Sequence, residues 1–525
     1  MNPNTRTNDP ALAEPIAYTQ RLRDLATADG HTTAIVFVSP DGAESKLTNA
    51  ELYVRSLRTA RLLQSRGVGS QSLVGIALGN TADAVVVAFA AWWCGACVMP
   101  LSHRLPDTEL DQVLEAAVES GRRLFVAGDL TTGRAKVIPR ADLATANSMS
   151  SEPLPVVIPN PGRAIPSGGS TGRPKLITDG GPMVALADVV SPMSQLFGSR
   201  LRQSILILGP IYHTGPFGSL FGGLFNAGCV VLMEQFDPEL ALRLVERHRI
   251  KRIWTVPVQL LRMARVPGVD DADLSSVESL YHSGAACPAW LKRRWIELVG
   301  PEHVYEGFGS SESVGALIIR GDEWLKHPGS VGRPQITDIR IRNADGALCE
   351  PHEVGEIFMR WAQSPGGAPP PVYTYWGSPP AKTDGDGCVS VGDLAWQDEE
   401  GYVYIADRRV DMIITGGVNV YPAEVEATLT EIEAVRDVAV VGVPDDEWGR
   451  RVHAIIETER PSDELVAELD RHCRTSMAPP KVPKSYEFLA ALPRNDAGKI
   501  RRAALAADRE AGWSDSMVRP PREGH

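Results

Sequence analysis

The sequence predicts an α/β fold with a large N-terminal domain of α/β subdomains and a small α+β C-terminal domain. Short apolar segments rich in β-branched residues alternate with segments of helical periodicity along most of the chain. A charged stretch at Asp407–Asp411, followed by a glycine pair, separates a final portion with strand and helix patterns of its own. The 525 residues are too many for one hydrophobic core, and 43% hydrophobic residues suffice for more than one.

The large domain is predicted to contain an early strand at 73–78, followed by an uncharged run at Ala84–Met99. This run is shorter than the roughly 20 residues that a membrane span requires, and it contains Gly95. We therefore interpret it as a buried helix that leads into a strand. Further apolar segments predict buried strands, and segments of mixed polarity predict helices. These are strands 204–208 and 229–233 and helices 240–248 and 290–299.

The final portion contains apolar segments at 438–443 and 453–457, which predict strands, and a helical pattern at 463–474. These elements are enough for a small α+β domain. The segment Ser364–Pro371 is dominated by proline and glycine, and we interpret it as a surface loop rather than a domain boundary.

Composition and charge restrict the class of partner. The net charge is −12 with acidic and basic residues interspersed, which argues against nucleic acid or an anionic membrane as the main partner. The polar segment 1–15 lacks the apolar core of a signal peptide, so a cytoplasmic protein is expected. Seven scattered cysteines suit a reducing compartment. Cys94 and Cys97 have the spacing of a redox or zinc pair, but their apolar surroundings favour buried structural thiols.

The segment Ser167–Lys175 is the clearest functional signal, because its glycines, hydroxyls and lysine suit a loop that surrounds phosphates. Glycine lets backbone N–H groups approach an anion, hydroxyls add donors, and lysine adds a charge. The segment differs from the usual nucleotide P-loop, since Arg173 and Pro174 precede the lysine. An ordinary flexible surface loop is the alternative. The candidate phosphate-binding residues are Ser167, Gly168, Gly169, Ser170, Thr171, Gly172 and Lys175.

Further motifs follow this segment in order along the chain. They are Pro210–His213, Ser283–Ala286, Glu306–Glu312, Gly329–Pro334, Ser390–Asp393, Asp407–Arg408 with Thr415–Gly417, and Arg494–Lys499. With this set the chain resembles, over essentially its whole length, the adenylate-forming superfamily of acyl-CoA synthetases, aryl-CoA ligases, luciferases and peptide-synthetase adenylation domains. Segments 320–329 and 390–405 are most similar to bacterial bile-acid–CoA ligases.

The resemblance implies a two-step reaction that uses ATP, Mg²⁺ and CoA. A carboxylate attacks the α-phosphate of ATP to give an acyl-adenylate and pyrophosphate, and the acyl group then passes to a thiol. Residues 1–407 are implied to form an N-terminal domain that binds ATP and the acid, and residues 408–525 a mobile lid that carries Lys499. The lid would rotate near residue 410, so that Gly416 and Gly417 line a pantetheine tunnel. The family usually has Asp or Lys where this chain has Val410, which leaves the second step open.

The resemblance also assigns residues to the nucleotide. Glu312 is implied to be the Mg²⁺ carboxylate with Ser311 beside it, since a hard cation prefers oxygen ligands. Without the resemblance, Glu312 would be interpreted as a helix-capping residue. Phe308 stands where the family usually has a tyrosine against adenine. Glu306 stands where related ligases often have glutamine, and Ala285 is a further cofactor-binding candidate.

Asp393 and Arg408 are implied to bind the ribose or phosphate, although an aspartate after glycine can also be a turn residue. His213 is implied to border the acyl pocket and the reacting carboxylate, where a lone histidine near a strand end is more often structural. Lys499 is implied to bind the α-phosphate and the carboxylate during adenylation, and a solvated surface charge is its alternative. The candidate catalytic residues are therefore His213, Glu312 and Lys499.

The segments that the family uses for its acyl pocket are dominated by Gly, Ala and Ser here, which predicts a roomy pocket. Between Leu201 and Phe236 the only acidic residue is Glu234, so an amino acid substrate is not expected. We expect a bulky alicyclic, steroid or aromatic acid. The stretch after Lys499 is too short for a carrier domain, so the acceptor is expected to be free CoA or a separate carrier protein. Transfer to nitrogen, activation of nitrite, and a nucleotide-binding regulator without catalysis stay open as alternatives.

Overall fold

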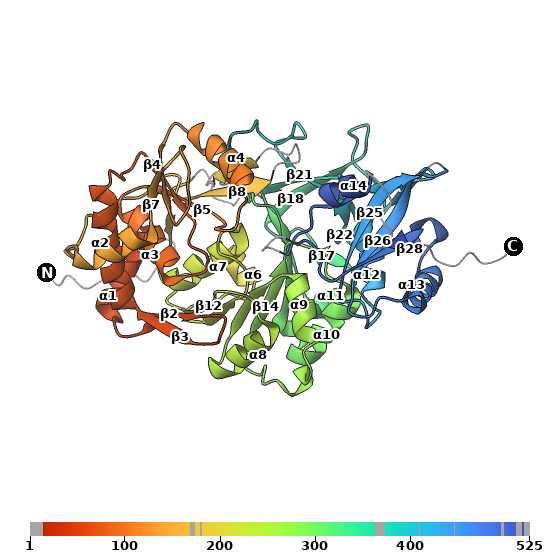
Figure 1. The fold of residues 1–525 in the computed structure, drawn as a ribbon, viewed down its shortest axis with the longest axis horizontal. Helices are drawn as coiled ribbons and strands as arrows, with labels where there is room; N and C mark the ends of the chain where they lie inside the picture. The colour runs from red at the N-terminus through yellow and green to blue at the C-terminus, as the bar shows by residue number, and fades with distance from the viewer. Residues whose placement is uncertain are drawn as a thin grey trace.

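The computed structural model describes residues 14–168, 174–178, 181–362, 373–408, 410–445, 447–494, 498–510 and 517–518. A large N-terminal part and a smaller C-terminal part lie next to each other along the longest axis, with the C-terminal part in blue in Figure 1. Sheets and helices alternate in the large part, and the predicted α/β class is confirmed.

The central sheet of the large part has eight strands in the order β16-β15-β14-β13-β11-β12-β2-β3. Neighbours from β15 to β2 are parallel, whereas the two edge strands pair antiparallel. The apolar segments predicted as strands 204–208 and 229–233 lie in its middle. The strands are β2 (Thr33–Val38), β3 (Glu44–Thr48), β11 (Ser204–Ile207), β12 (Cys229–Met233), β13 (Arg252–Thr255), β14 (Ser279–Ser283), β15 (Val304–Gly309) and β16 (Ala316–Arg320).

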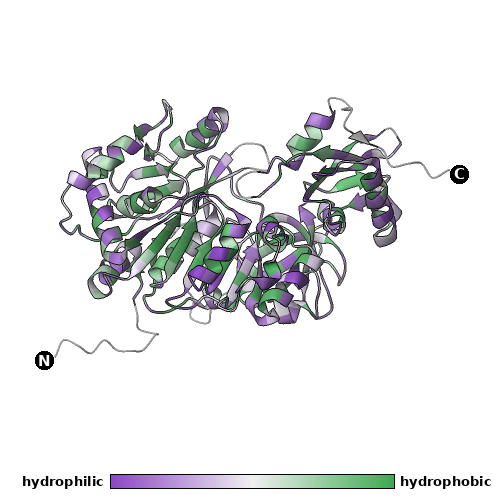
Figure 2. Ribbon diagram, turned by 60° about the horizontal axis from the view of Figure 1, so that its bottom comes forward, coloured by the Kyte–Doolittle hydropathy of each residue, from purple (hydrophilic) through white to green (hydrophobic). Residues whose placement is uncertain are grey.

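Helices cover both faces of this sheet, and the alternation of side chains along the strands divides the core into two layers. Ile205 and Ile207 pack with α1, α2, α3 and α7, whereas Leu206 packs with α8, α9 and α10. The hydrophobic colour of the strands between more polar helices is visible in Figure 2. The helices are α1 (Tyr18–Ala28), α2 (Asn49–Ser65), α3 (Ala82–Trp93), α6 (Pro192–Leu196), α7 (Thr214–Phe225), α8 (Pro238–Arg247), α9 (Pro257–Ala264), α10 (Ala289–Val299) and α11 (Gly321–Trp324).

A second, parallel sheet of the large part has the order β5-β4-β6-β7. The uncharged run Ala84–Met99 forms most of α3 and the start of β5, as predicted. Cys94 and Cys97 are buried there, and burial raises the pKa of Cys94 to about 12. All seven cysteines are described and carry free thiols. The elements are β4 (Ser72–Ile76), β5 (Cys97–Pro100), α4 (Asp107–Val118), β6 (Arg123–Ala127), β7 (Lys136–Ile138) and α5 (Arg140–Ala144).

Smaller sheets complete the large part. Three strands pair as β20-β9-β8, and five antiparallel strands pair as β17-β22-β21-β19-β18. Their bounds are β8 (Ala164–Gly168), β9 (Pro174–Thr178), β20 (Thr374–Trp376), β17 (Ser330–Gly332), β18 (Thr337–Arg342), β19 (Gly355–Trp361), β21 (Val389–Gln397) and β22 (Val403–Arg408). The short pair is β1 (Ile16–Ala17) with β10 (Val184–Ala185), and 3-10 helices cover Thr145–Ser148, Val269–Asp271, Pro301–His303 and Pro479–Lys481.

The C-terminal part has its own hydrophobic core, which begins at Ile413 and includes Val440 and Leu469. The predicted strands 438–443 and 453–457 and the helix near 463–474 are all present. Its elements are β23 (Ile413–Thr415), β24 (Val418–Val420), α12 (Pro422–Leu429), β25 (Asp437–Asp445), β26 (Gly449–Glu457), α13 (Asp463–Ser476), β27 (Ser485–Leu489), α14 (Arg502–Glu510) and β28 (Met517–Val518).

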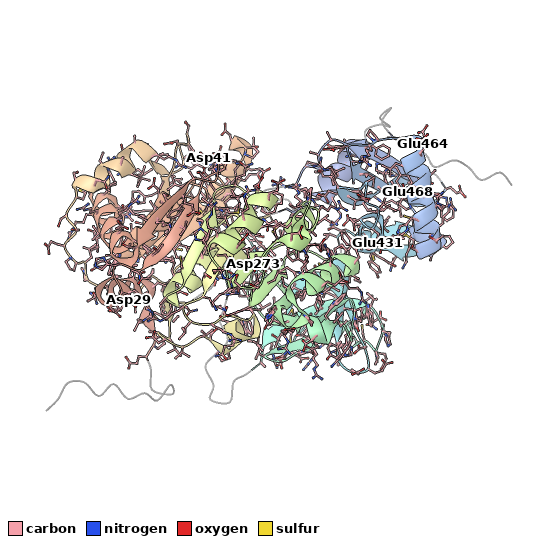
Figure 3. The ribbon with its side chains drawn as sticks, turned by 90° about the horizontal axis from the view of Figure 1, so that it is seen from below. Asp29, Asp41, Asp273, Glu431, Glu464 and Glu468 are labelled. Atoms are coloured by element: carbon pink, nitrogen blue, oxygen red, sulfur yellow. The ribbon has the colours of Figure 1, made fainter. Side chains whose placement is uncertain are left out.

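Charge and hydrophobicity of the described residues agree with the composition. Figure 3 labels Asp29, Asp41 and Asp273 on the large part and Glu431, Glu464 and Glu468 on the small part, so acidic side chains occur on both. Within the described ranges, no helix combines the length and the apolar character that crossing a bilayer demands.

Candidate functional site

A β-hairpin presents the predicted phosphate loop. Strands β8 and β9 pair antiparallel, so that Ser167 lies opposite Lys175 and Gly168 lies opposite Pro174. The predicted residues Gly169, Ser170, Thr171 and Gly172 fall in the connection between these strands and lie outside the described residues. The hairpin fixes both ends of the loop, and Lys175 extends from its second strand.

Lys175 is held by a carboxylate and an aromatic ring from distant segments. Its Nζ lies 3.0 Å from Oε1 of Glu312 and 3.8 Å from the ring centroid of Tyr375. The Tyr375 hydroxyl donates a hydrogen bond to the same Glu312 oxygen at 2.5 Å. Tyr375 is on β20, which pairs with β9, and this pairing brings it to the lysine. The sequence analysis missed Tyr375, because no local motif marks a residue that a strand pairing delivers.

Glu312 has the electrostatic properties of a ligand for a cation. Burial opposes its ionisation, but the Tyr375 hydrogen bond and the Lys175 charge outweigh burial and hold the pKa of Glu312 below its ordinary value. Ser311 precedes it in the same turn and is half-buried. Throughout the described ranges no three His, Cys, Asp or Glu side chains gather to hold a metal by themselves. The donor set therefore fits a hard cation whose other ligands are phosphate and water oxygens.

Asp393 and Arg408 face each other across neighbouring strands. They are directly paired in the β21–β22 ladder, and Nε of Arg408 lies 3.9 Å from Oδ1 of Asp393. Burial raises the pKa of Asp393 to about 6, although the Arg408 charge opposes the shift. Their relative positions agree with the predicted pair, since an arginine and a carboxylate that share one face can bind a sugar and a phosphate together.

Lys499 lies in the electrostatic range of these groups. Its side chain is exposed, yet the protein atoms around it and the charge of Arg408 lower its pKa, while Asp393 and Glu312 oppose that shift. The preceding Gly498 has φ +73°, and a Cβ there would lie 2.6 Å from Cγ1 of Val258 on α9. Glycine is therefore required at this position, both for its backbone conformation and for the close approach to the large part.

Contacts on both sides of Lys499 hold the C-terminal part against the large part. Arg501 forms two parallel hydrogen bonds with Glu109 on α4, at 2.6 and 2.7 Å. At the other edge, Arg265 donates to the Thr430 carbonyl at 3.2 Å, and the indole of Trp290 donates to the Thr430 hydroxyl at 3.3 Å. The two parts thus meet in an arrangement that brings Lys499 to Glu312 and Asp393.

His213 is the residue before α7 and is held in place from behind by Asn80. The buried Asn80 side chain donates to the carbonyls of Gly209 and Met233 at 3.1 and 2.9 Å and accepts from the Ile211 amide at 2.9 Å. His213 itself is half-buried, with its ring 4.7 Å from that of Tyr212. The sequence analysis missed Asn80, whose partners are all distant in sequence.

The nucleotide-base candidates lie at the ends of β14 and β15. Ala285 is exposed just after β14, and Phe308 is half-buried on β15. Glu306, two residues earlier on β15, is buried in an ion pair with Lys292 of α10. Glu306 therefore already has a partner inside the protein, and its contact with a nucleotide stays a prediction.

The glycine pair Gly416–Gly417 forms the turn between β23 and β24, with φ of +53° and +80°. The Gly416 amide donates to the Trp448 carbonyl at 2.9 Å. The hairpin exposes apolar side chains, since Ile414 is 54% and Val418 40% exposed. Val410, at the predicted hinge, is 68% exposed. Apolar side chains grouped on such a surface are typical of a contact region.

The space beyond His213 differs from the sequence expectation. The glycines of this region predict a roomy pocket, but large aromatic rings from the neighbouring strands fill the room that they leave. A Cβ at Gly215 would collide with the Trp254 ring, and a Cβ at Gly307 would collide with the Tyr281 side chain. Both rings are buried, at 7% and 9% exposure. The expectation of a roomy pocket was therefore wrong, because small residues indicate a close approach as readily as an empty space.

Comparison with known proteins gives consistent similarities. The model of the AMP-binding enzyme family matches residues 22–365, and that of the AMP-binding enzyme C-terminal domain matches residues 424–499. A feruloyl-CoA synthase from Amycolatopsis sp. is 34% identical over 478 residues, covering 87% of this chain and 93% of the relative. A long-chain-fatty-acid–CoA ligase from Bacillus subtilis is 29% identical, covering 92% and 93% of the two chains.

Solved structures show the same architecture. The o-succinylbenzoate CoA synthetase of Bacillus subtilis, solved with its acyl-adenylate intermediate, superimposes with a TM-score of 0.76 and 25% identity. The match covers 94% of this chain and 98% of that one.

Proposed function

The chain belongs to the AMP-binding enzyme family, and we propose that it activates a compact aromatic carboxylic acid with ATP and transfers the acyl group to CoA. Like its relatives, it is an ATP-dependent, AMP-forming acid–CoA ligase. The observation that carries the proposal is the convergence of Lys499 with Glu312, Asp393 and Arg408, contributed by both parts of the chain.

The first step joins two anions, the acid and the triphosphate. Their repulsion must be offset by cations that are already oriented when the reaction begins. Lys499 is proposed to hold the carboxylate and the α-phosphate, while Lys175 and the 167–172 loop hold the outer phosphates. A Mg²⁺ ion bound by Glu312 beside Ser311 would neutralise part of the phosphate charge. The carboxylate oxygen bonds to the α-phosphorus, and pyrophosphate leaves.

The nucleoside has matching candidates on neighbouring strands. Asp393 is proposed to accept hydrogen bonds from the two ribose hydroxyls, and Arg408 to bind the sugar or phosphate beside it. Phe308 is proposed to stack on adenine, which needs the ring but not the hydroxyl of a tyrosine. Ala285 after β14 would face the base from the other strand end.

The second step requires a path for the thiol of CoA. The boundary between residues 407 and 408 is proposed as the domain joint, with Val410 in the hinge. Support comes from the separate core that starts at Ile413 and from the exposed hairpin at Gly416–Gly417. Rotation of the C-terminal domain would withdraw Lys499 and bring this hairpin to the cleft, where its glycines leave room for the pantetheine arm.

The proposed acid class depends on two observations. The feruloyl-CoA synthase relative acts on an aromatic acid by its name, and it shares 34% identity over most of both chains. The buried rings of Trp254 and Tyr281 reduce the space beyond His213. Of the alicyclic, steroid and aromatic acids that we expected, the aromatic class therefore has the most support.

The test is pyrophosphate release over a panel of single-ring aromatic, steroid and long-chain aliphatic acids, with and without CoA. We expect release with aromatic acids, and CoA thioester only when CoA is present. Adenylate formation without CoA consumption would favour a carrier protein or nitrogen acceptor instead. No release with any carboxylic acid would contradict the proposed function.

A further inference from the structure

The space between α7 and the central sheet is bounded by glycines whose missing side chains are replaced by aromatic rings. Gly209 follows β11, Gly215 lies in the first turn of α7, and Gly307 is on β15. We refer to the region among them as the glycine-lined space. It begins directly beside His213, so a molecule whose carboxylate lies near Lys499 extends into it.

The indole of Trp254 on β13 lies between two of these glycines. A Cβ at Gly209 would be 3.1 Å from Cζ3 of the indole, and a Cβ at Gly215 would overlap the opposite edge of the same ring. The side chain is 7% exposed, and it is part of the core on the α7 side. Any residue larger than glycine at 215 would displace this ring, so the two positions determine each other.

Tyr281 occupies the neighbouring position on β14. It is the ladder partner of Trp254, and side chains of paired residues lie on the same face of the sheet. Its ring lies against Gly307 and makes an edge contact with Phe197, at a centroid distance of 4.9 Å. Trp254 and Tyr281 therefore form a continuous aromatic wall under α7.

We propose that Trp254, with Tyr281 beside it, ends the acyl site and restricts the enzyme to flat, single-ring acids. This inference rests on the proposed acid–CoA ligase function. A planar ring can pack against the aromatic wall without moving it, since stacked or edge-on contacts between rings are favourable. A long alkyl chain or a fused-ring acid would have to displace side chains that are packed against backbone.

A purely structural role for Trp254 makes a different prediction. If the indole only filled the core, its truncation would lower stability and reduce activity with all acids by the same factor. If it ends the site, truncation changes the preference among acids. The ratio of kcat/KM values for two acids of different length separates these roles, because a general loss of folded enzyme cancels from the ratio.

The experiment compares Trp254→Ala and Trp254→Phe with wild type, using benzoate-sized, biphenyl-sized and long-chain fatty acids. Hydroxylamine trapping of the adenylate is the readout, so the acceptor does not matter. We expect Trp254→Ala to shift the kcat/KM ratio toward the longer acids by about tenfold or more, in the range that a few methylene-sized contacts provide. Trp254→Phe should shift it less in the same direction and protects the test if the alanine variant does not fold.

Trp295→Phe is the matched control, since Trp295 is fully buried in the core on the opposite face of the sheet. It should lower thermal stability and leave the ratio unchanged. An unchanged ratio in folded Trp254 variants, or equal use of long-chain acids by wild type, would overturn the inference. If wild type forms no adenylate with any acid, the proposed function fails instead. Calorimetric binding of the same acids with AMP present then still reports the size limit.

Discussion

At the scale of single residues, Lys499 combines an exposed position with a strongly charged environment. Its pKa is lowered by the surrounding protein and by Arg408, while two carboxylates counteract the shift. An ammonium in such a place is oriented before substrates arrive, which is the condition for electrostatic catalysis. Lys175, in contrast, has its charge paired with Glu312.

Replacing Lys499 with alanine should slow adenylate formation by about two orders of magnitude or more, the range seen when one oriented donor is removed. Thioester formation from synthetic adenylate should stay close to the wild-type rate, because the lysine is withdrawn in that step. Single-turnover assays of each step measure this contrast. Lys481→Ala, which removes a lysine that pairs with Glu424 on the same domain, is the control. A similar loss in both steps would mean that Lys499 is not confined to adenylation.

Asp393 makes nucleotide binding depend on pH. Its pKa is raised to about 6, so the carboxylate gains a proton as the pH falls through 6 rather than near 4. A protonated Asp393 accepts fewer hydrogen bonds from the ribose. The Kd for ATP should therefore rise below about pH 6, by up to tenfold per pH unit. Asp393→Asn should bind ATP weakly at every pH, and a slope retained in this variant would assign the titration to another group. Calorimetry without the acid substrate gives both measurements.

At the scale of elements, the segment that carries Lys499 is fixed from both sides. Gly498 contacts α9 and Arg501 binds Glu109 on α4, so two helices of the large part define where the lysine lies. The fork between Arg501 and Glu109 has a good geometry, but the arginine is 65% exposed. Water and salt therefore weaken it, and its effect on the position of the domain is modest.

Breaking this fork should slow adenylation two- to fivefold, as expected for the loss of an exposed ion pair. Glu109→Arg and Arg501→Glu should each slow the first step and leave the second unchanged, and the double variant should recover most of the loss. Pre-steady-state pyrophosphate release measures the effect at low and high salt. Exchanging the charges of Arg450 and Glu510, which pair within the C-terminal part, should change nothing. Failure of the double exchange to restore the rate would show that the fork does not position the lysine.

Elements and site residues were predictable to different degrees. Strands such as 204–208 and the helix–strand run at 84–99 were confirmed, because apolar runs and their lengths determine them locally. Tyr375 and Asn80 were not predictable, since strand pairing and long-range hydrogen bonds bring them to the site. The filling of the glycine-lined space by Trp254 also depends on packing between separate strands.

At the scale of the whole molecule, buried histidines connect stability to pH in both parts of the chain. Burial holds the pKa of His282 well below its ordinary value, and Lys292 adds to this effect. Burial likewise lowers the pKa of His453, although Glu487 opposes the shift. The unfolded chain binds protons at these histidines near pH 6.5, whereas the folded chain binds them only at lower pH. Their contribution to stability is therefore complete above 6.5 and is lost as the pH falls toward the folded pKa values.

The melting temperature should accordingly fall between pH 7 and pH 5. Each histidine contributes up to about 1.4 kcal/mol of unfolding free energy per pH unit below 6.5. His453→Gln should flatten this dependence, measured by thermal denaturation at matched ionic strength. Asp393 acts in the opposite direction, since its raised pKa lets the folded state take up a proton first below about pH 6. A melting temperature that is constant from pH 7 to 5 in wild type would contradict the assignment of neutral buried histidines.

The ion pair between Lys175 and Glu312 has a consequence for the order in which the empty site can be filled. A bare phosphate ion would have to separate the lysine from its carboxylate and leave Glu312 buried with a single hydroxyl partner. A nucleotide that arrives with its own divalent cation exchanges partners instead, so each charge that is released is matched at once. The resting cleft thus discriminates against inorganic phosphate, which is abundant in cells, by keeping its lysine occupied until a complete metal–nucleotide complex is present.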